Sequence, residues 1–230
     1  MQANDVMTQN VITVEPDTQV RDIARLLLEN RISAVPVVNA EGRVLGIVSE
    51  GDLMRRVENG TDQHKSWWLK SIFAGANDAG SYVKSHGRKA SEIMTPNPLT
   101  IEETMDLGDV ARLLEKHHIK RVPVVREHKL VGIVSRANLL QGLASAGPQP
   151  SESPADDRAI RDTIIREIED KAGVRIGGIN VVVENGNVEL WGLVDAKEQR
   201  MAAQVAAENT NGVKRVENNL NLAPRGVGGF

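Results

Sequence analysis

Two short polar motifs in this sequence have the residue types to contact a ligand, and each stands where a helix is expected to begin. Ser49-Glu50-Gly51-Asp52 places a hydroxyl and a carboxylate three residues apart. A carboxylate can accept hydrogen bonds from two neighbouring ribose hydroxyls, and free N–H groups at a helix N-terminus attract phosphate. The same spacing is also a capping box, which satisfies those N–H groups without a ligand. The motif therefore predicts a ribose phosphate contact or a helix cap.

The second motif, Ser135-Arg136-Ala137-Asn138, has the same spacing but carries an amide in place of the acid. A hydrogen bond to a charged group contributes about 1.5–3 kcal/mol, against about 1 kcal/mol for a neutral pair. A difference of about 1.4 kcal/mol is tenfold in affinity. We therefore expect two unequal binding sites, the stronger one built on Asp52.

Both motifs belong to a segment that occurs twice. The matching elements are Met7-Thr8 and Met94-Thr95, Val35-Pro36-Val37-Val38 and Val122-Pro123-Val124-Val125, and Gly46-Ile47-Val48-Ser49 and Gly132-Ile133-Val134-Ser135. The first two pairs are offset by 87 positions and the third by 86. Solenoid repeats have periods of about 20–50 residues, so this is a duplicated small domain. A cleft between two such copies is a natural ligand site.

Hydrophobic spacing predicts a β-α-β-β-α module in each copy. In the first copy it indicates a helix from about Thr18 to Asn30, strands at 35–38 and 44–48 around a turn, and a helix after Ser49. The second copy repeats this order, with a helix near 107–116, strands at 122–125 and 130–134, and a helix after Ser135. After a Ser- and Pro-rich linker at 144–155, the order α-β-β-α-β is expected over 156–223, with an Asn185-Gly186 hairpin turn.

The segment between the copies differs in composition. From Arg55 to Lys89 there are seven Arg and Lys against three acidic residues, together with Trp67 and Trp68. Such aromatic residues either cover a core edge or a dimer seam, or meet an acidic partner, a nucleic acid or a membrane surface. We treat residues 61–89 as a basic insert.

Composition excludes several classes of protein. The chain has 230 residues, 40% of them apolar, and a net charge of −3, so nothing points to a nucleic-acid partner. Cysteine is absent, which removes disulfides and thiol nucleophiles. The sequence shows neither a signal peptide nor an apolar run of about 20 residues, and we expect a cytoplasmic protein.

The repeated motifs resemble a tandem pair of cystathionine-β-synthase (CBS) domains over about residues 1–142 without the insert, with the repeats at 1–60 and 90–143. The last part, with Gly186, Gly192-Leu193-Val194 and Gly212 to Val216, resembles a BON domain, a module associated with membranes and envelopes. The resemblance implies an α+β protein in which the two CBS repeats pack as an intramolecular pair and a small BON-like domain follows. It also implies an adenosine-containing ligand between the repeats and a homodimer.

The resemblance and the repeat together assign the residues that line a nucleotide site. Around Ser49 and Asp52 these are Thr13, Val14, Ser33, Ala34, Val35 and Pro36, and around Ser135 and Asn138 they are Thr100, Lys120, Arg121, Val122 and Pro123. The apolar residues of this set are expected to form the apolar walls of a purine site. Lys120 and Arg121, with Arg136 beside them, suit phosphates or form a solvated basic edge.

No residues suggest catalysis or a metal site. His117 and His118 are adjacent, and neighbours on a helix point about 100° apart, so they cannot chelate one ion. They are expected to end a helix, where they favour the dipole, or to contact phosphate in a pH-sensitive way. We find no nucleophile–base pair and no Walker-type loop, and expect neither enzyme activity nor a required cofactor.

The sequence leaves two hypotheses of different classes. In the first, the protein is a sensor that binds AMP, ADP or ATP, with S-adenosylmethionine or NAD as alternatives, and signals through the dimer or the BON-like domain. In the second, it is an envelope-associated scaffold whose last domain and insert bind lipid or protein, and the CBS pair only dimerises. The last domain has nine basic residues against twelve acidic ones, which favours a protein partner as much as an anionic lipid surface.

Overall fold

The computed structural model describes residues 1–54, 83–145, 154–174 and 176–223. Most of the expected insert at 61–89, including Trp67 and Trp68, and most of the expected linker therefore lie outside the described residues. The chain forms two compact units, of which one comprises Met1–Asn10, Ile101–Val124 and Val131–Phe230, and the other Val11–Thr100 and Val125–Leu130. Neither unit coincides with a single sequence repeat.

The second of these units contains the first Ser-x-x-Asp motif. Its sheet has the order β1 (Ala34–Val38), β2 (Val44–Ser49) and β3 (Thr95–Pro96), and its helices are α2 (Val20–Asn30), α3 (Glu50–Met54) and α6 (Ala90–Ile93). In α2 the buried residues Ile23 and Leu27 are four apart, so one helical face packs against Val35, Val37 and Val48 of the sheet. The first strand expected in this module is reduced to a parallel bridge between Val14 and Val37.

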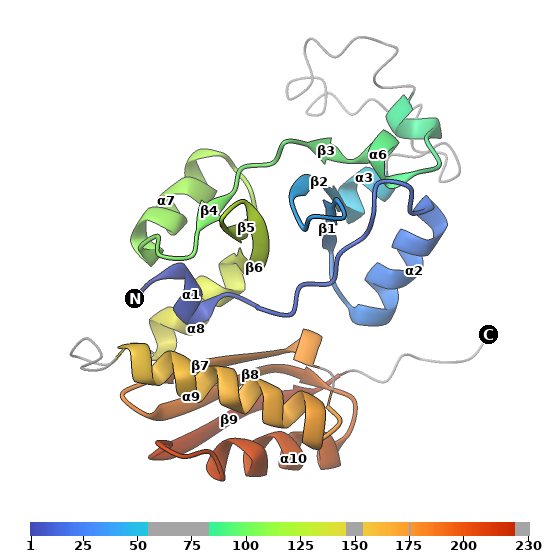
Figure 1. Ribbon diagram of the computed structural model, residues 1–230. Coiled ribbons are helices and arrows are strands. Elements are labelled where there is room, and N and C mark those ends of the chain that lie inside the picture. The colour runs from blue at the N-terminus through green and yellow to red at the C-terminus, as the bar shows by residue number, and fades with distance from the viewer. Residues whose placement is uncertain (55–82, 146–153, 175, 224–230) are drawn as a thin grey trace. The chain divides into compact units, whose positions relative to one another are not determined.

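The other unit carries the second motif. It contains most of a sheet with the order β4 (Ile101–Glu102), β5 (Arg121–Arg126) and β6 (Lys129–Ser135), accompanied by α1 (Ala3–Val6), α7 (Leu107–Lys116) and α8 (Arg136–Ser145) (Figure 1). Val110 and Leu114 of α7 pack with Val122, Val124 and Val134 in one core. His117 caps the C-terminal end of α7, and both expected histidines are exposed there.

The Met-Thr elements of the two repeats are exchanged between the sheets. Thr95 pairs with Ile47 of β2, and a Cβ on Gly46 would overlap the Met94 side chain. In the same way Thr8 bridges to Ile133 of β6, and a Cβ on Gly132 would overlap Met7. Each repeated glycine therefore makes room for a methionine that belongs, in sequence, to the other repeat.

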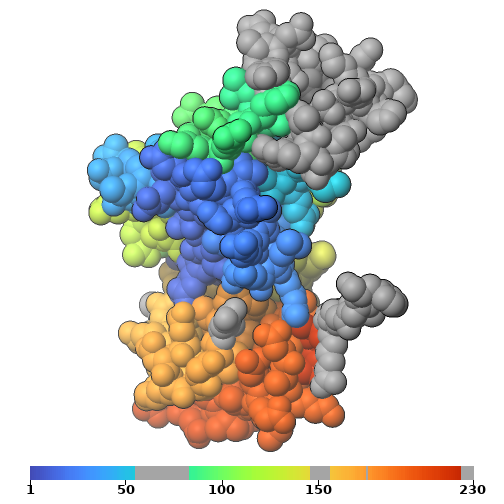
Figure 2. All heavy atoms as spheres, turned by 90° about the vertical axis from the view of Figure 1, so that its right-hand side faces the viewer, coloured from blue at the N-terminus to red at the C-terminus, as the bar shows by residue number. Residues whose placement is uncertain are grey.

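The last part of the chain has the expected α-β-β-α-β order. It consists of α9 (Pro154–Arg166), which continues as a π-helical turn (Glu167–Lys171), a short 3-10 helix (Ile176–Gly178), β7 (Ile179–Glu184), β8 (Asn187–Val194), α10 (Lys197–Glu208) and β9 (Arg215–Leu222). β8 pairs antiparallel with β7 and parallel with β9, because α10 provides the crossover. Its atoms, orange to red in Figure 2, gather in one body with its own apolar core.

The hairpin of this domain has the turn that its sequence predicts. Asn185 and Gly186 both have positive φ angles, 53° and 76°, as a type I′ turn requires. The buried Asp157 carboxylate of α9 accepts hydrogen bonds from the backbone N–H groups of Asn185, at 2.8 Å, and Gly186, at 2.9 Å. The carboxylate therefore fixes the turn against the first helix.

An exposed carboxylate at the start of α6 provides a pH-dependent cap. Glu92 accepts hydrogen bonds from the backbone N–H groups of Lys89, at 3.0 Å, and Arg88, at 2.5 Å, and these bonds lower the pKa of Glu92 from its usual 4.5. A lowered pKa adds stability that is present above pH 4.5 and is lost as the pH falls through the folded-state value.

We therefore expect Glu92→Gln to lower the urea midpoint at pH 7, by an amount that shrinks as the pH falls below 4.5 through the folded-state pKa of Glu92, because the wild-type group then becomes neutral as well. Glu29→Gln, on an exposed side chain near the C-terminal end of α2, is the control and should not lower the midpoint. A Glu92→Gln deficit that does not shrink as the pH falls would contradict the charge-assisted capping role.

Candidate functional site

The first motif forms a helix cap at the junction of β2 and α3. The Asp52 carboxylate, 6% exposed, accepts hydrogen bonds through one oxygen, Oδ2, from the Ser49 backbone N–H at 2.9 Å and from the Ser49 hydroxyl at 2.7 Å. A carboxylate has about four acceptor positions on its two oxygens, so capping and contact with a ligand are compatible. The cap holds the acid at the start of the helix.

The predicted neighbours of this motif lie in the same unit. Ala34 is the strand partner of Ser49, and the Glu50 N–H donates to the Ser33 carbonyl at 3.0 Å. On the other side of β1, the Val14 N–H donates to the Pro36 carbonyl at 3.0 Å. The structure therefore places Val14, Ser33 and Ser49 along β1, with Ser33 and Ser49 at its Ala34 end and Val14 beside its second half.

Not every predicted neighbour offers a side-chain surface. Val35 and Val122 are fully buried in their cores, so they support the strands from inside. Thr13, Ser33 and Ser49 are half-buried, and Thr100, just before β4, is exposed. A ligand at the first motif would therefore meet small polar groups and strand backbone.

The second motif repeats the cap with an amide. Asn138 Oδ1 accepts from the Ser135 N–H at 2.8 Å and from the Ser135 hydroxyl at 2.6 Å, and the residue is 4% exposed. Its Nδ2 group has the Thr8 hydroxyl and the Gln141 Oε1 atom as acceptors, each at 3.5 Å. Asparagine thus replaces the acid without loss of the cap and adds a donor that aspartate lacks.

The charges around the two motifs differ. The Arg136 N–H donates to the Lys120 carbonyl at 3.2 Å, as Glu50 does to Ser33 in the first repeat. The side chains of Lys120 and Arg136 are exposed, that of Arg121 is half-buried, and Pro123 is buried in β5. The first motif thus presents acids, which suit hydroxyl groups, and the second presents cations, which suit phosphate oxygens.

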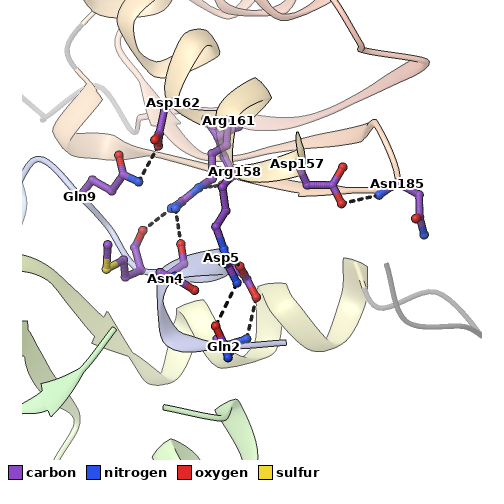
Figure 3. Close-up of polar contacts among 11 residues, drawn as sticks. Gln2, Asn4, Asp5, Gln9, Asp157, Arg158, Arg161, Asp162 and Asn185 are labelled. Carbon is purple, nitrogen blue, oxygen red and sulfur yellow. Dashed lines mark hydrogen bonds and ion pairs between the residues drawn. The ribbon is translucent and has the colours of Figure 1, made fainter. Parts of the chain in front are cut away.

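The last domain contains a buried arginine that was not expected from the sequence. Arg161 of α9 is 1% exposed and donates to the carbonyls of Val181 and Asn4, each at 2.6 Å, and to that of Met7 (Figure 3). Burial lowers the pKa of the Arg161 guanidinium to about 10. The signal for its burial was present, because Arg161 lies three or four residues from the core residues Ile164 and Ile165 and so shares their helix face.

Within the described parts of the chain, no helix has both the length and the apolar character needed to cross a bilayer.

Family models match most of the sequence. The CBS domain model matches residues 3–59 and 90–145, and the BON domain model matches residues 156–224. These segments agree with the two repeats and with the last domain of the fold.

Two relatives are similar to about three fifths of this chain. The CBS domain-containing proteins CBSX2 and CBSX1, both chloroplastic and from Arabidopsis thaliana, are 33% and 34% identical over 147 and 143 residues. These matches cover 60% and 58% of this chain, and the chain spans about three fifths, 61% and 59%, of the two relatives.

A solved structure supports the same assignment. The crystal structure of CBSX2 in complex with AMP has a TM-score of 0.54 and 29% identity, and the match covers 62% of this chain and 96% of that one. The matched fold is that of the CBS pair. The chain therefore belongs to the CBS-domain proteins, with a pair of CBS segments followed by a BON domain.

Proposed function

We propose that this protein is a non-enzymatic regulatory protein that binds an adenine nucleotide or a related adenosyl ligand at the helix-start motifs of its CBS segments. The observation that carries the proposal is the Ser49–Asp52 cap, which holds a buried carboxylate at a helix start beside the Ala34 end of β1. AMP in the similar Arabidopsis protein CBSX2 supports this class of ligand.

The two motifs suit different parts of a nucleotide. The Asp52 carboxylate matches the adjacent hydroxyls of a ribose, since a charged acceptor forms stronger hydrogen bonds than a neutral one. Arg136 and Lys120 supply positive charge near the second motif, where phosphate is the better match. If the protein has two conformational states, the ligand shifts the equilibrium between them only when it binds one state more tightly than the other.

The test is isothermal titration of the full-length protein with AMP, ADP, ATP, S-adenosylmethionine and NAD in turn. Asp52→Asn is the decisive variant, because Asn138 shows that asparagine makes the same cap. We expect the variant to fold normally and to bind the preferred ligand about tenfold more weakly, since one charge-assisted bond is lost.

Glu29→Gln, on the exposed end of α2, serves as the control and should bind like wild type. Wild-type affinity in Asp52→Asn would remove Asp52 from the site. Failure of the wild-type protein to bind any member of the panel would leave both motifs as helix caps and overturn the proposed function.

We also propose that the protein acts as a homodimer in the cytoplasm, where adenine nucleotides are available. Exposed apolar side chains on α8 support the dimer, because Leu140 is 67% and Leu143 is 73% exposed and residues three apart share a helix face. Light scattering of the purified protein decides the oligomeric state.

A further inference from the structure

Helix α8 begins at the second motif and reaches the BON domain. One turn after Asn138, the Oε1 atom of Gln141 accepts a hydrogen bond from Asn180 Nδ2 of β7 at 2.7 Å. One turn further, the Ser145 hydroxyl donates to Glu189 of β8 at 2.8 Å. The same short helix therefore carries the candidate ligand group and two contacts with the BON domain.

Residues 1–10 contact both the second CBS segment and the BON domain. The backbone of Thr8 exchanges two hydrogen bonds of 3.0 Å with Ile133 of β6. Asn180 Nδ2 also donates to the Val6 carbonyl at 3.1 Å, and Arg161 donates to the Asn4 and Met7 carbonyls at the end of α1. Such carbonyls have no partner within a helix, so the guanidinium satisfies groups that would otherwise be left unpaired.

Further polar contacts surround this buried centre. Arg158 pairs with the Asp5 carboxylate at 2.8 Å and donates to Gln2 Oε1 at 3.0 Å, and Gln9 donates to Asp162 at 2.9 Å (Figure 3). We use the term docking contact for these hydrogen bonds and ion pairs, in which residues 1–10 and α8 meet the BON elements α9 and β7. Its centre is buried and polar, so small changes in geometry carry a large free-energy cost.

We propose that α8 couples the second motif to the docking contact, so that a nucleotide bound at Ser135 and Asn138 loosens the BON domain from residues 1–10. This inference rests on the proposed function, and it assigns the BON domain the role of the part that responds to the ligand.

The physical reason lies in the Asn138 amide. Its Nδ2 group faces Thr8, which belongs to the docking segment, and Gln141, which holds Asn180. A ribose hydroxyl or a phosphate that takes this donor removes it from both acceptors.

The packing of α8 does not absorb such a change. A Cβ on Gly142 would lie 2.9 Å from Val6 Cγ1 and 3.1 Å from Leu107 Cδ1, so the helix and α1 are in close contact. A displacement of α8 is therefore passed to α1 and to the carbonyls that Arg161 holds. Thermodynamic linkage requires the reverse effect as well. If the nucleotide weakens the docking contact, then weakening the docking contact increases the affinity for the nucleotide.

The test uses hydrogen–deuterium exchange and AMP titration on the full-length protein. Gln141→Met keeps the length of the side chain and removes the acceptor of Asn180. We expect the Val6–Thr8 and Val181–Val183 amides of the variant to exchange at least fivefold faster than those of wild type. Saturating AMP should increase the exchange of the same amides in wild type by the same factor. The variant should also bind AMP at least fivefold more tightly.

The matched control is Gln9→Met, which removes an exposed contact of the same docking surface and should change neither quantity by more than twofold. AMP binding to wild type with unchanged exchange, and with equal affinity in Gln141→Met, would overturn the coupling and leave the proposed function intact. Faster exchange in Gln141→Met, with no binding of AMP or any other member of the ligand panel to wild type, would overturn the proposed function. The nucleotide control of docking would fall with it, while the structural link through α8 would stand.

Discussion

Arg161→Met is expected to destabilise the full-length protein by about 2–4 kcal/mol, because it removes three hydrogen bonds from a buried charged group and leaves their acceptors without this donor. The acceptors are the carbonyls of Val181, Asn4 and Met7. Methionine keeps most of the apolar stem of arginine, so the loss reports the hydrogen bonds more than the packing.

The stabilising bonds work against the cost of burying the charge. Burial disfavours the charged form and lowers the pKa of Arg161 from its ordinary value to about 10. A difference of this size corresponds to roughly 3 kcal/mol. Between these two values the unfolded chain binds more protons than the folded one, so the contribution of this group to stability rises with pH. The free-energy cost of burying the charged guanidinium therefore applies in full below the folded-state pKa and decreases above it.

Urea denaturation at pH 7, 9 and 10.5 measures both effects. The gap between wild type and Arg161→Met should be about constant up to about pH 9 and widen at the highest pH, since only wild type gains from deprotonation. Arg166→Met, on an exposed side chain of the same helix, is the control and should cost less than about 0.5 kcal/mol. Equal stabilities of the Arg161 and Arg166 variants would show that the buried hydrogen bonds contribute nothing to the fold.

Local patterns were sufficient for most of the secondary structure. The Asn185-Gly186 pair predicts a type I′ hairpin, and the structure has it, because few residues other than Gly and Asn readily adopt positive φ at both positions. The helical spacing of Ile23 and Leu27 likewise predicts the buried face of α2. The sequence also left capping open for Ser49 and Asp52, and the structure shows the cap.

The exchange of the Met-Thr elements between the two sheets could not be predicted from the sequence, for a physical reason. Duplication makes Met7 and Met94 equivalent, and it makes Gly46 and Gly132 equivalent, so either methionine fits either glycine by size and polarity. Hydrophobic patterning gives the face of a residue but not which of two similar sheets it joins. The compact units consequently differ from the expected repeats at 1–60 and 90–143.

The burial of Arg161 was missed for a different reason. A count of nine basic against twelve acidic residues treats every charge as a surface charge. Burial of an arginine depends on acceptors that come from distant segments, here residues 4 and 7. Only the spacing of Arg161 from Ile164 and Ile168 along the helix indicated that Arg161 lies on the buried face.

Gly192→Ala is expected to destabilise the BON domain by about 3 kcal/mol or more, because strain and a clash act together. Gly192 has a φ angle of +129°, and a Cβ there would overlap the carbonyl oxygen of Gly178. That oxygen belongs to the backbone just before β7, whose first residue, Ile179, is the strand partner of Gly192. Relief of the clash would therefore require β7 and β8 to separate at this end of the hairpin.

The chain provides a matched control for this substitution. Gly173, in the same domain, also has a positive φ angle, +63°, but a Cβ there would have no atom within 4 Å. Gly173→Ala should therefore cost only the backbone strain, about 1–2 kcal/mol. Thermal and urea denaturation of both variants, with exchange of the Val181–Val183 amides as a local probe, separates the two contributions. Equal losses in the two variants would mean that the backbone at Gly178 moves freely and that the close approach of β7 and β8 adds no constraint.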